Sequence, residues 1–170
     1  NAVRRWSDVG PGLRPFDPEN RLFCSAVPRV GTVAPTAGRT TVSSLSPRGY
    51  PQPMWISASM GGYWGAELKY AGYDGLVIQG RAASPCYLLI EDDRGSIQEA
   101  GDLWGKGVYE TQRALKERHA PRRGAHPLQV AAIGPAGENR VRFASIIHRF
   151  ANAVGNGGLG GVMGAKHLKA

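Results

Sequence analysis

Glycines near the end of the sequence have a spacing that suits phosphate binding. Gly155, Gly157 and Gly160 match the pattern G-x-G-x-x-G. Because glycine lacks a Cβ atom, its backbone can approach a ligand closely, and successive amide N–H groups in such turns form concavities that bind anions. A dinucleotide-binding loop also needs an alternating strand–helix unit around it, which the preceding residues do not indicate. The spacing therefore predicts either an anion-binding loop or a cluster of packing glycines.

Two further segments carry groups that suit an anion. Gly61 and Gly62 lie between an expected strand and an expected helix, where backbone N–H groups can face a ligand. Arg39 stands where a glycine-containing loop enters a strand, and a guanidinium group binds phosphate or carboxylate through parallel hydrogen bonds. Each segment also has an ordinary interpretation, as a turn and as a solvated arginine, and the residue types alone leave both open.

The other chemistry-bearing residues indicate structure more than catalysis. Segment 113–126 is basic, but its glutamates at helical spacing and its lack of interleaved aromatic residues favour an exposed helix face and loop over a nucleic-acid site. His148 has no Cys, Ser or paired His nearby, so we expect a hydrogen-bonded structural histidine. Cys24 and Cys86 are the two cysteines, without the spacing of a zinc or iron–sulfur site. Redox chemistry would therefore need a bound cofactor.

Length and composition favour one globular domain. The chain has 170 residues, 42% of them apolar, and a net charge of +8. It contains no apolar stretch long enough for a membrane span and no signal-peptide pattern, which predicts a soluble, cytoplasmic protein. Because it begins at Asn1 and stops at Ala170 after an apolar and basic run, we expect a single domain over 1–170 that is a fragment of a longer chain.

Apolar runs of strand length and β-branched residues predict strands, and the helical spacing of apolar residues predicts two helices. One helix starts at Tyr63 and stops at Gly72, and the other runs from Trp104 toward Pro121. Turns are expected at 93–95 and 134–139. The expected strands are 21–27, 39–46, 55–59, 75–78, 87–90, 96–98, 129–133 and 141–147. Strands outnumber helices, which places the chain in the α+β class.

Several longer motifs resemble one known family. In chain order they are APTAGR (34–39), GGYWGAELKYAGYDG (61–75), LWGKGVYET (103–111), AAIGPAGENRVRFASI (131–146) and GNGGLGGVMGAKHLKA (155–170). Together they resemble the N-terminal domain of the aldehyde ferredoxin oxidoreductase family, whose members are tungsten or molybdenum enzymes with two pyranopterin cofactors per metal. The resemblance implies an α+β domain of two packed β-sheets and a few short helices, on which the two pterins lie.

The resemblance also implies which residues bind the cofactor. Segment 58–62 matches the family's A-N-S-G-G, whose Asn, here Ser59, gives its main-chain carbonyl to a magnesium ion that bridges the two pterin phosphates. Segment 152–158 matches R-A-A-G-R-G-G, in which the carbonyl at the position of Ala153 is the second magnesium ligand. Arg39 falls at the family arginine between the iron–sulfur cluster and the pterin. The implied cofactor-binding residues are Arg39, Ser59, Gly61, Gly62, Asn152, Ala153, Gly155, Asn156, Gly157 and Gly158.

The sequence departs from the family pattern at two of these positions. Asn152 and Asn156 stand where the family has arginine. Each loss of a charge-assisted phosphate contact costs about 1.5–3 kcal/mol if nothing replaces it. Asn still tolerates a positive φ and donates an amide hydrogen, and Arg149 is a candidate to supply one missing charge. The departure predicts a divergent branch of the family.

The resemblance implies that this chain is the cofactor-binding part of a larger oxidoreductase. In that enzyme an aldehyde, or a related oxo or aromatic substrate, reacts at the metal, and electrons pass through a [4Fe–4S] cluster to ferredoxin or another iron–sulfur carrier. The family's cluster cysteines, a C-x2-C-x3-C group and a distant fourth, belong to later helical domains, so this chain does not ligate the cluster. The expected partners are the remaining domains, the electron carrier, a small-molecule substrate and a second copy of the chain.

A second interpretation comes from another class of protein. The basic segment would then be the face of a catalytically silent module that binds an acidic protein or nucleic acid. Its binding to nucleic acid would fall steeply with added salt, because phosphate contacts release counterions.

Overall fold

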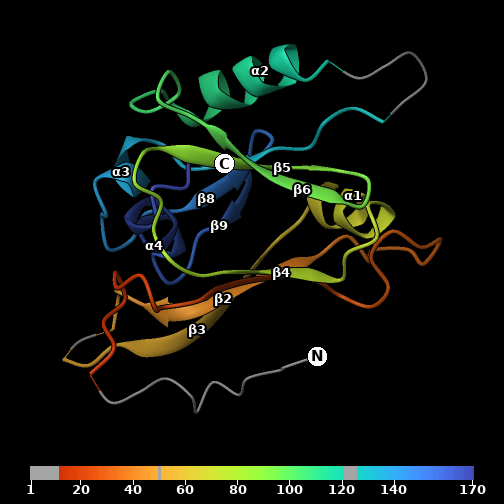
Figure 1. Ribbon diagram of the computed structural model, residues 1–170. Helices are drawn as coiled ribbons and strands as arrows, with labels where there is room; N and C mark the ends of the chain where they lie inside the picture. The colour runs from red at the N-terminus through yellow and green to blue at the C-terminus, as the bar shows by residue number, and fades with distance from the viewer. Residues whose placement is uncertain (1–11, 50, 121–125) are drawn as a thin grey trace.

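A four-stranded antiparallel sheet forms one layer of the molecule. The computed structural model describes residues 12–49, 51–120 and 126–170. The strand order in this sheet is β3-β2-β1-β4, with β3 and β4 at its edges (Figure 1). Its strands are β1 (Leu22–Ala26), β2 (Thr40–Ser46), β3 (Met54–Met60) and β4 (Gly75–Ile78).

Strand β2 shows why these residues form a sheet with one buried face. Thr40, Val42, Ser44 and Ser46 are buried, whereas the residues between them are half-buried, which follows the period of two in a strand. The register pairs Thr41 with Ser59 on β3, so Ser59 lies on the outer face of the sheet and is exposed. The inner face packs on the core.

The second layer is built from two smaller antiparallel sheets. One pairs β5 (Cys86–Glu91) with β6 (Arg94–Glu99), and the other has the order β7-β8-β9. The C-terminal residues 167–170 lie between these sheets and join them through their backbone. The amide of Cys86 donates to His167 O at 2.9 Å, and the amide of Ile133 donates to Lys169 O at 3.0 Å. The strands of the second small sheet are β7 (Ala131–Ala132), β8 (Ile146–His148) and β9 (Asn152–Val154).

The predicted α+β class is therefore confirmed, with antiparallel sheets and few short helices. The strands fall into three sheets, and residues 167–170 turn two of them into one layer that faces the four-stranded sheet. The helices are α1 (Trp64–Tyr70), α2 (Val108–Arg118), α3 (Pro135–Glu138) and α4 (Leu159–Ala165).

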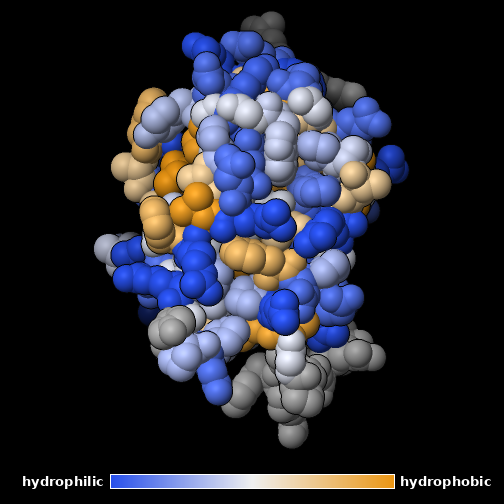
Figure 2. Space-filling model, turned by 90° about the vertical axis from the view of Figure 1, so that its left-hand side faces the viewer, coloured by the Kyte–Doolittle hydropathy of each residue, from blue (hydrophilic) through white to orange (hydrophobic). Residues whose placement is uncertain are grey.

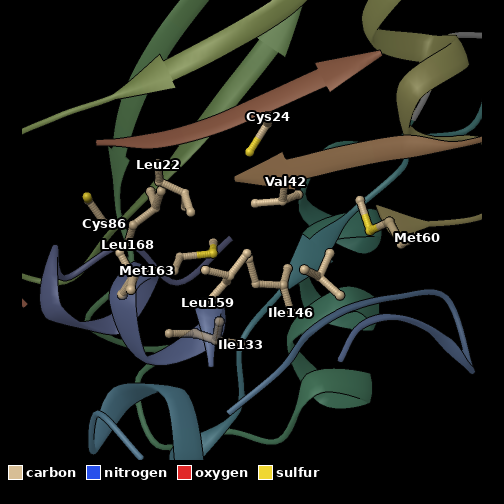
Figure 3. Close-up of a cluster of buried hydrophobic side chains, with 12 residues drawn as sticks. Leu22, Cys24, Val42, Met60, Cys86, Ile133, Ile146, Leu159, Met163 and Leu168 are labelled. Carbon is tan, nitrogen blue, oxygen red and sulfur yellow. The ribbon is translucent and has the colours of Figure 1, made fainter. Parts of the chain in front are cut away.

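Helix α4 occupies the centre of the core, and all seven of its residues are buried. Figure 3 shows Leu159 and Met163 of α4 facing Leu22 and Val42 of the four-stranded sheet, with Ile146 of β8 beside them. Glycines allow α4 to lie against backbone on its other side. A Cβ atom at Gly160 would stand 2.5 Å from Ser145 O, and one at Gly164 would overlap Gly137 O.

A second apolar cluster lies under α2. It contains Leu103, Leu115 and Val130, together with side chains from β5 and β7. Thr111 and Gln112 complete the buried face of the helix, while its basic residues lie on the exposed side. This amphipathic pattern is the one that the sequence indicates for 104–120.

Two buried lysines near the C-terminus are held by hydrogen bonds. Lys169 is fully buried and pairs with Glu138, and it also donates to Lys106 O at 2.7 Å. Lys166 donates to Pro18 O at 3.1 Å and to Gly80 O at 3.2 Å. Burial, with a smaller effect of Arg81, lowers the pKa of Lys166 to about 8. These contacts anchor the segment that joins the two small sheets.

Some predicted element bounds are wrong for local reasons. The strand expected at 141–147 is only β8, since Gly160 approaches the backbone at 144–145 and its amide donates to Ala144 O. The strand expected at 129–133 is the two-residue β7, and the turn expected at 134–139 is helix α3 with Pro135 at its start.

Two more predicted bounds shift by a few residues. The second helix begins at Val108, and Trp104 precedes it. The hairpin turn consists of Asp92 and Asp93, because Arg94 and Gly95 already belong to β6. The predicted helix end at Pro121 lies outside the described residues. In the part of the chain that the structure describes, no helix is long and apolar enough to cross a membrane.

The packing of α4 on α3 gives the first prediction. We expect Gly164→Ala to destabilise the fold by about 1–3 kcal/mol, because the added methyl group overlaps Gly137 O. Thermal unfolding of the full-length protein measures the effect. Gly101→Ala is the matched control, since a Cβ atom there meets nothing within 4 Å. Equal melting temperatures for the two variants would show that α4 does not need this glycine.

Candidate functional site

The turn that follows β3 is the centre of the first group of predicted site residues. Met60 ends the strand in the core, and Gly61, Gly62 and Tyr63 lead into α1. Gly62 has a φ of +93°, a conformation that side-chain-bearing residues rarely adopt. Among the described residues, the amides of Gly61 and Gly62 have no hydrogen-bond acceptor. The turn therefore presents two free main-chain donors.

Strands β8 and β9 lie directly behind this turn. A Cβ atom at Gly61 would stand 3.2 Å from Asn152 Oδ1, and one at Gly62 would stand 2.5 Å from His148 Cδ2. Asn152 and His148 are paired residues of β9 and β8. The structure thus brings Asn152 to the Gly61–Gly62 turn, and Gly62, with its positive φ and the ring of His148 behind it, requires glycine.

Arg39 approaches the same turn from the other side. A Cβ atom at Gly38, its neighbour, would stand 3.4 Å from Gly62 O. Arg39 is exposed, and its carbonyl accepts a hydrogen bond from the Val27 amide at 3.5 Å. Arg39, Ser59, Gly61, Gly62 and Asn152 therefore gather around the C-terminal end of β3.

The glycine-rich loop after β9 forms a second group, which packs on the connection between β2 and β3. Ser46 Oγ donates to Gly157 O at 2.6 Å, and Arg48 Nη1 donates to Asn156 Oδ1 at 2.8 Å. A Cβ atom at Gly157 would stand 2.8 Å from Ile56 Cγ2. Ile56 lies on β3 and precedes Gly61 by five residues, so the two groups contact different points along the same strand.

The three glycines of the G-x-G-x-x-G pattern have different roles. Gly155 is exposed, and neither its amide nor that of Asn156 has an acceptor in the described parts of the chain. Gly160 is instead a buried residue of α4, and its amide donates to Ala144 O at 3.0 Å. Gly160 is therefore a packing glycine, while Gly155 carries a main-chain donor without an acceptor in the described residues.

Ala153 lies between the two groups, in β9. It is half-buried, and its register partner is Ile147 of β8. Contacts also join β9 to β3, the strand that carries Ser59. Gly158 is buried because its backbone lies against Arg142 O and Pro47, and it takes a φ of +66° immediately before α4.

Two arginines lie near the candidate site residues. The guanidinium of Arg149 lies 5.1 Å from the ring centre of Tyr63, a cation–π contact over the Gly61–Gly62 turn. Arg48 reaches Asn156 through the hydrogen bond already described. The sequence singles out Arg149 as a source of charge near Asn152, whereas Arg48 carries no motif signal and lies far from Asn156 in sequence.

His148 is a site residue whose role its sequence context does not reveal. It is fully buried and hydrogen-bonded, so the prediction of a structural histidine is confirmed. Its Nδ1 lies 2.9 Å from Val130 O, and the Tyr63 amide donates to its Nε2 at 3.2 Å. The second bond connects it to the Gly61–Gly62 turn, and only the fold places these two segments together.

The side chains that the structure describes do not form a metal centre. No group of three His, Cys, Asp or Glu residues in the described ranges is arranged to hold a metal ion. Burial raises the pKa of Cys24 to about 12 and also raises the pKa of Cys86, so neither thiol is activated. A metal at this site would need main-chain oxygens or ligands from a cofactor.

The basic segment is partly compensated by nearby carboxylates. Arg118 Nη2 lies 2.6 Å from Asp102 Oδ2, and His126 Nδ1 lies 3.0 Å from Glu67 Oε1. Residues 121–125, which belong to the basic loop expected there, lie outside the described residues. Where it is described, this segment has the predicted form of an exposed helix face.

The fold and the site together define an α+β domain that presents main-chain donors and glycine turns along one strand. Comparison with known proteins then gives the family. Residues 2–170 match the family model "Aldehyde ferredoxin oxidoreductase, N-terminal domain". The chain belongs to this family.

The relatives agree with this assignment. The chain is 48% identical over 164 residues to the tungsten-containing aldehyde ferredoxin oxidoreductase of Pyrococcus abyssi, and the match covers 96% of the chain and 26% of that protein. It is 37% identical to the aliphatic sulfonate oxidoreductase, WOR-like subunit, of Pyrococcus furiosus, and the match covers 97% of the chain and 27% of that protein. The chain thus spans about a quarter of the length of these relatives.

A solved structure has the same fold. It is the active site complex BamBC of benzoyl coenzyme A reductase in complex with 1,5 dienoyl-CoA. The TM-score is 0.87 and the identity is 44%, and the match covers 96% of this chain and 24% of that one. This likeness confirms the fold that the family resemblance predicts.

The environment of His148 gives a prediction about pH. Desolvation lowers its pKa below the usual 6.5; the Val130 carbonyl opposes this effect, and Arg149 and Lys116 add to it. Below about pH 6.5 the unfolded chain binds a proton that the folded chain does not, so the free energy of unfolding decreases as the pH falls. As the pH is lowered from about 7.5 to about 5, we expect the melting temperature of the full-length wild type to approach that of His148→Asn. A melting-temperature difference between the two proteins that does not change with pH would contradict this prediction.

Proposed function

We propose that this chain is the cofactor-binding domain of a tungsten or molybdenum oxidoreductase that carries two pyranopterins per metal. Residues 1–170 are then a single domain of a longer chain. The relatives at 44–48% identity are named tungsten-containing aldehyde ferredoxin oxidoreductases, which supports an oxidoreductase of this type. The domain alone is not expected to turn over substrate, because it supplies no cluster cysteines of its own.

The observation that carries the proposal is the row of free main-chain donors beside β3. The amides of Gly61, Gly62, Gly155 and Asn156 have no acceptor among the described residues, and they belong to two turns, one after β3 and one after β9, the strand that contacts β3. Unpaired amide groups in glycine turns bind anions. Two such turns on neighbouring strands fit a ligand with two anionic groups, such as a pair of pterin phosphates.

The residues present fit this cofactor through backbone more than through side chains. The carbonyl oxygens of Ser59 and Ala153 are the proposed ligands of a magnesium ion between the phosphates. Such oxygens suit magnesium, which prefers oxygen ligands. The side chains of Asn152 and Asn156 would add amide donors. Arg48, which bonds to Asn156, and Arg149, which lies over Tyr63, would supply positive charge near the positions where the family has arginine.

The bound metal and its pterins would supply the redox chemistry. The role of this chain would be to hold the phosphates and to orient the cofactor with Arg39 at its edge. In the parent enzyme the proposed reaction oxidises an aldehyde to an acid, with ferredoxin or another iron–sulfur carrier as electron acceptor through a [4Fe–4S] cluster. The remaining domains would ligate that cluster.

The substrate class is proposed more broadly than aldehydes. The chain is 44% identical both to the tungsten-containing aldehyde ferredoxin oxidoreductase of Pyrococcus furiosus and to a chain of a complex that was solved with 1,5 dienoyl-CoA. These equal identities support a substrate class that is not limited to aldehydes. The proposed substrate is therefore an aldehyde or a related oxo or aromatic compound.

Exposed apolar side chains support a larger assembly. Phe143 and Phe150 are 74% and 80% exposed, and Tyr109 is 60% exposed. Figure 2 shows apolar side chains between hydrophilic ones on the side of the molecule that carries α3. We propose that the remaining domains of the parent chain cover such surfaces. A second copy of the chain in a homodimer and a cytoplasmic location stay predictions from the sequence.

The metal content of the full-length protein tests the proposed function. We expect tungsten or molybdenum at about one atom per chain, with two pterins, magnesium and iron, because the family cofactor has these parts. Elemental analysis and pterin release from the purified protein measure them. A metal-free protein with intact cluster cysteines downstream would overturn the proposal. Nucleic-acid binding that falls with salt would then favour the alternative of a basic binding module.

A main-chain magnesium ligand makes a specific prediction at Ser59. We expect Ser59→Ala to keep its magnesium and tungsten or molybdenum within about 20% of the wild-type content, because the ligand is the carbonyl and not the hydroxyl. Elemental analysis of the full-length variant gives the answer. Ser57→Ala is the control, since Ser57 is also exposed on β3 and its hydroxyl bonds with Ser43 Oγ at 2.8 Å. Loss of magnesium in Ser59→Ala alone would mean that the side chain is needed.

A further inference from the structure

The ring of His148 joins three segments that are far apart in sequence. The side chain lies in β8 and is fully buried. Its Nδ1 is 2.9 Å from Val130 O, just before β7, and its Nε2 is 3.2 Å from the amide nitrogen of Tyr63, just before α1. Both ring nitrogens are therefore engaged, and each contacts main chain.

The two hydrogen bonds specify one state of the ring. A carbonyl oxygen only accepts, so Nδ1 must carry the hydrogen that it shares with Val130 O. The Tyr63 amide only donates, so Nε2 must be the unprotonated acceptor. The neutral ring with hydrogen on Nδ1 satisfies both groups. The other neutral form would place a lone pair against the carbonyl and an N–H against an N–H.

The ring also fills the space behind the cofactor-binding turn. A Cβ atom at Gly62 would stand 2.5 Å from His148 Cδ2 and 3.1 Å from Asn152 Nδ2. Asn152 is paired with His148 across β8 and β9. The packed ring prevents the turn from moving inward, and the Tyr63 hydrogen bond prevents it from moving outward.

We propose that His148 is a positioning residue that fixes the Gly61–Gly62 turn in the conformation that binds the cofactor. This inference rests on the proposed function, because it takes the turn to be a phosphate-binding element. His148 itself would not touch the cofactor. It acts through the Tyr63 amide, so that the free amides of Gly61 and Gly62 point outward together before the ligand arrives. Preorganised donors of this kind bind more tightly than mobile ones.

Two conservative variants separate the two hydrogen bonds. In His148→Gln the side-chain amide reaches the position of Nε2 and can still accept from Tyr63. In His148→Asn the shorter amide reaches only the position of Nδ1, so it keeps the Val130 contact and loses the Tyr63 contact. Each variant retains one polar contact. Their difference therefore reports on the turn rather than on burial of a polar group.

Hydrogen–deuterium exchange at the Tyr63 amide in the full-length protein is the first readout. We expect exchange about tenfold faster in His148→Asn than in wild type, and near wild-type exchange in His148→Gln, because only His148→Asn loses the hydrogen bond of the Tyr63 amide. The second readout is the content of tungsten or molybdenum and pterin. It should fall about tenfold in His148→Asn, as is typical when a supporting contact is removed.

Leu89→Ala is the control for general destabilisation. Leu89 is a buried residue of β5 in the cluster under α2, so the variant should lower the melting temperature without speeding exchange at Tyr63. Equal exchange in His148→Asn and wild type would overturn the proposal. Equal effects of His148→Asn and His148→Gln on exchange at Tyr63 would also overturn it. The same holds if His148→Asn shows faster exchange at Tyr63 but keeps the wild-type cofactor content.

These outcomes are distinct from failure of the proposed function. If the wild-type full-length protein contains no tungsten, molybdenum or pterin, the proposed function is overturned and the cofactor role of His148 with it. The exchange comparison would then still show whether His148 holds the turn. If the wild type contains the cofactor, and the His148 variants have the same Tyr63 exchange and the same cofactor content as the wild type, the proposed function stands and the positioning role is wrong.

Discussion

The close packing of α4 against the backbone of residues 137–145 is the constraint on which the rest of the structure depends. Gly160 and Gly164 remove the side chains that would keep these segments apart. Because α4 lies so deep, the residues before it must cross the edge of β3, and the residues after it must enter the layer formed by β5 and β7. The same packing therefore places both the glycine-rich loop and the strand-like C-terminal segment.

The C-terminal segment shows how this constraint is held in place. Its backbone bonds to Cys86 and Ile133 join two sheets, each too small to form a layer alone. Lys169 is buried there at the cost of desolvation, which its pairing with Glu138 of α3 offsets. Helix α3 is also the element against which Gly164 of α4 packs. The Lys169–Glu138 ion pair therefore connects this packing to the layer that residues 167–170 join.

The sequence predicts local structure well where strand composition is clear and poorly where glycine packing decides. Strands β1, β2 and β3 lie within about one residue of the predicted ranges, because apolar and β-branched residues of strand length stand between turn residues. Residues 141–145 have the composition of a strand, but the approach of Gly160 replaces the ladder with turns. The joining role of 167–170 has no signal in the sequence, since it pairs with residues 86–88, far away in the chain. The family resemblance supplied the site residues, while the contacts of His148 and Arg48 needed the fold.

The distribution of charge explains how the site can differ from the family pattern. The net charge of +8 suggests a polyanion when the sequence is read alone. In the structure, Arg48 donates to Asn156, and the guanidinium of Arg149 lies over Tyr63, which follows the turn that Asn152 contacts. The family resemblance implies arginine at both asparagine positions. A guanidinium that reaches the same place from a neighbouring segment preserves the local potential, because charge interactions depend on distance and not on chain position. A site built from main-chain donors tolerates such exchanges, since its geometry is set by glycine turns and by the buried contacts behind them. That tolerance is consistent with one domain serving relatives whose names specify an aldehyde, a sulfonate and a coenzyme A ester.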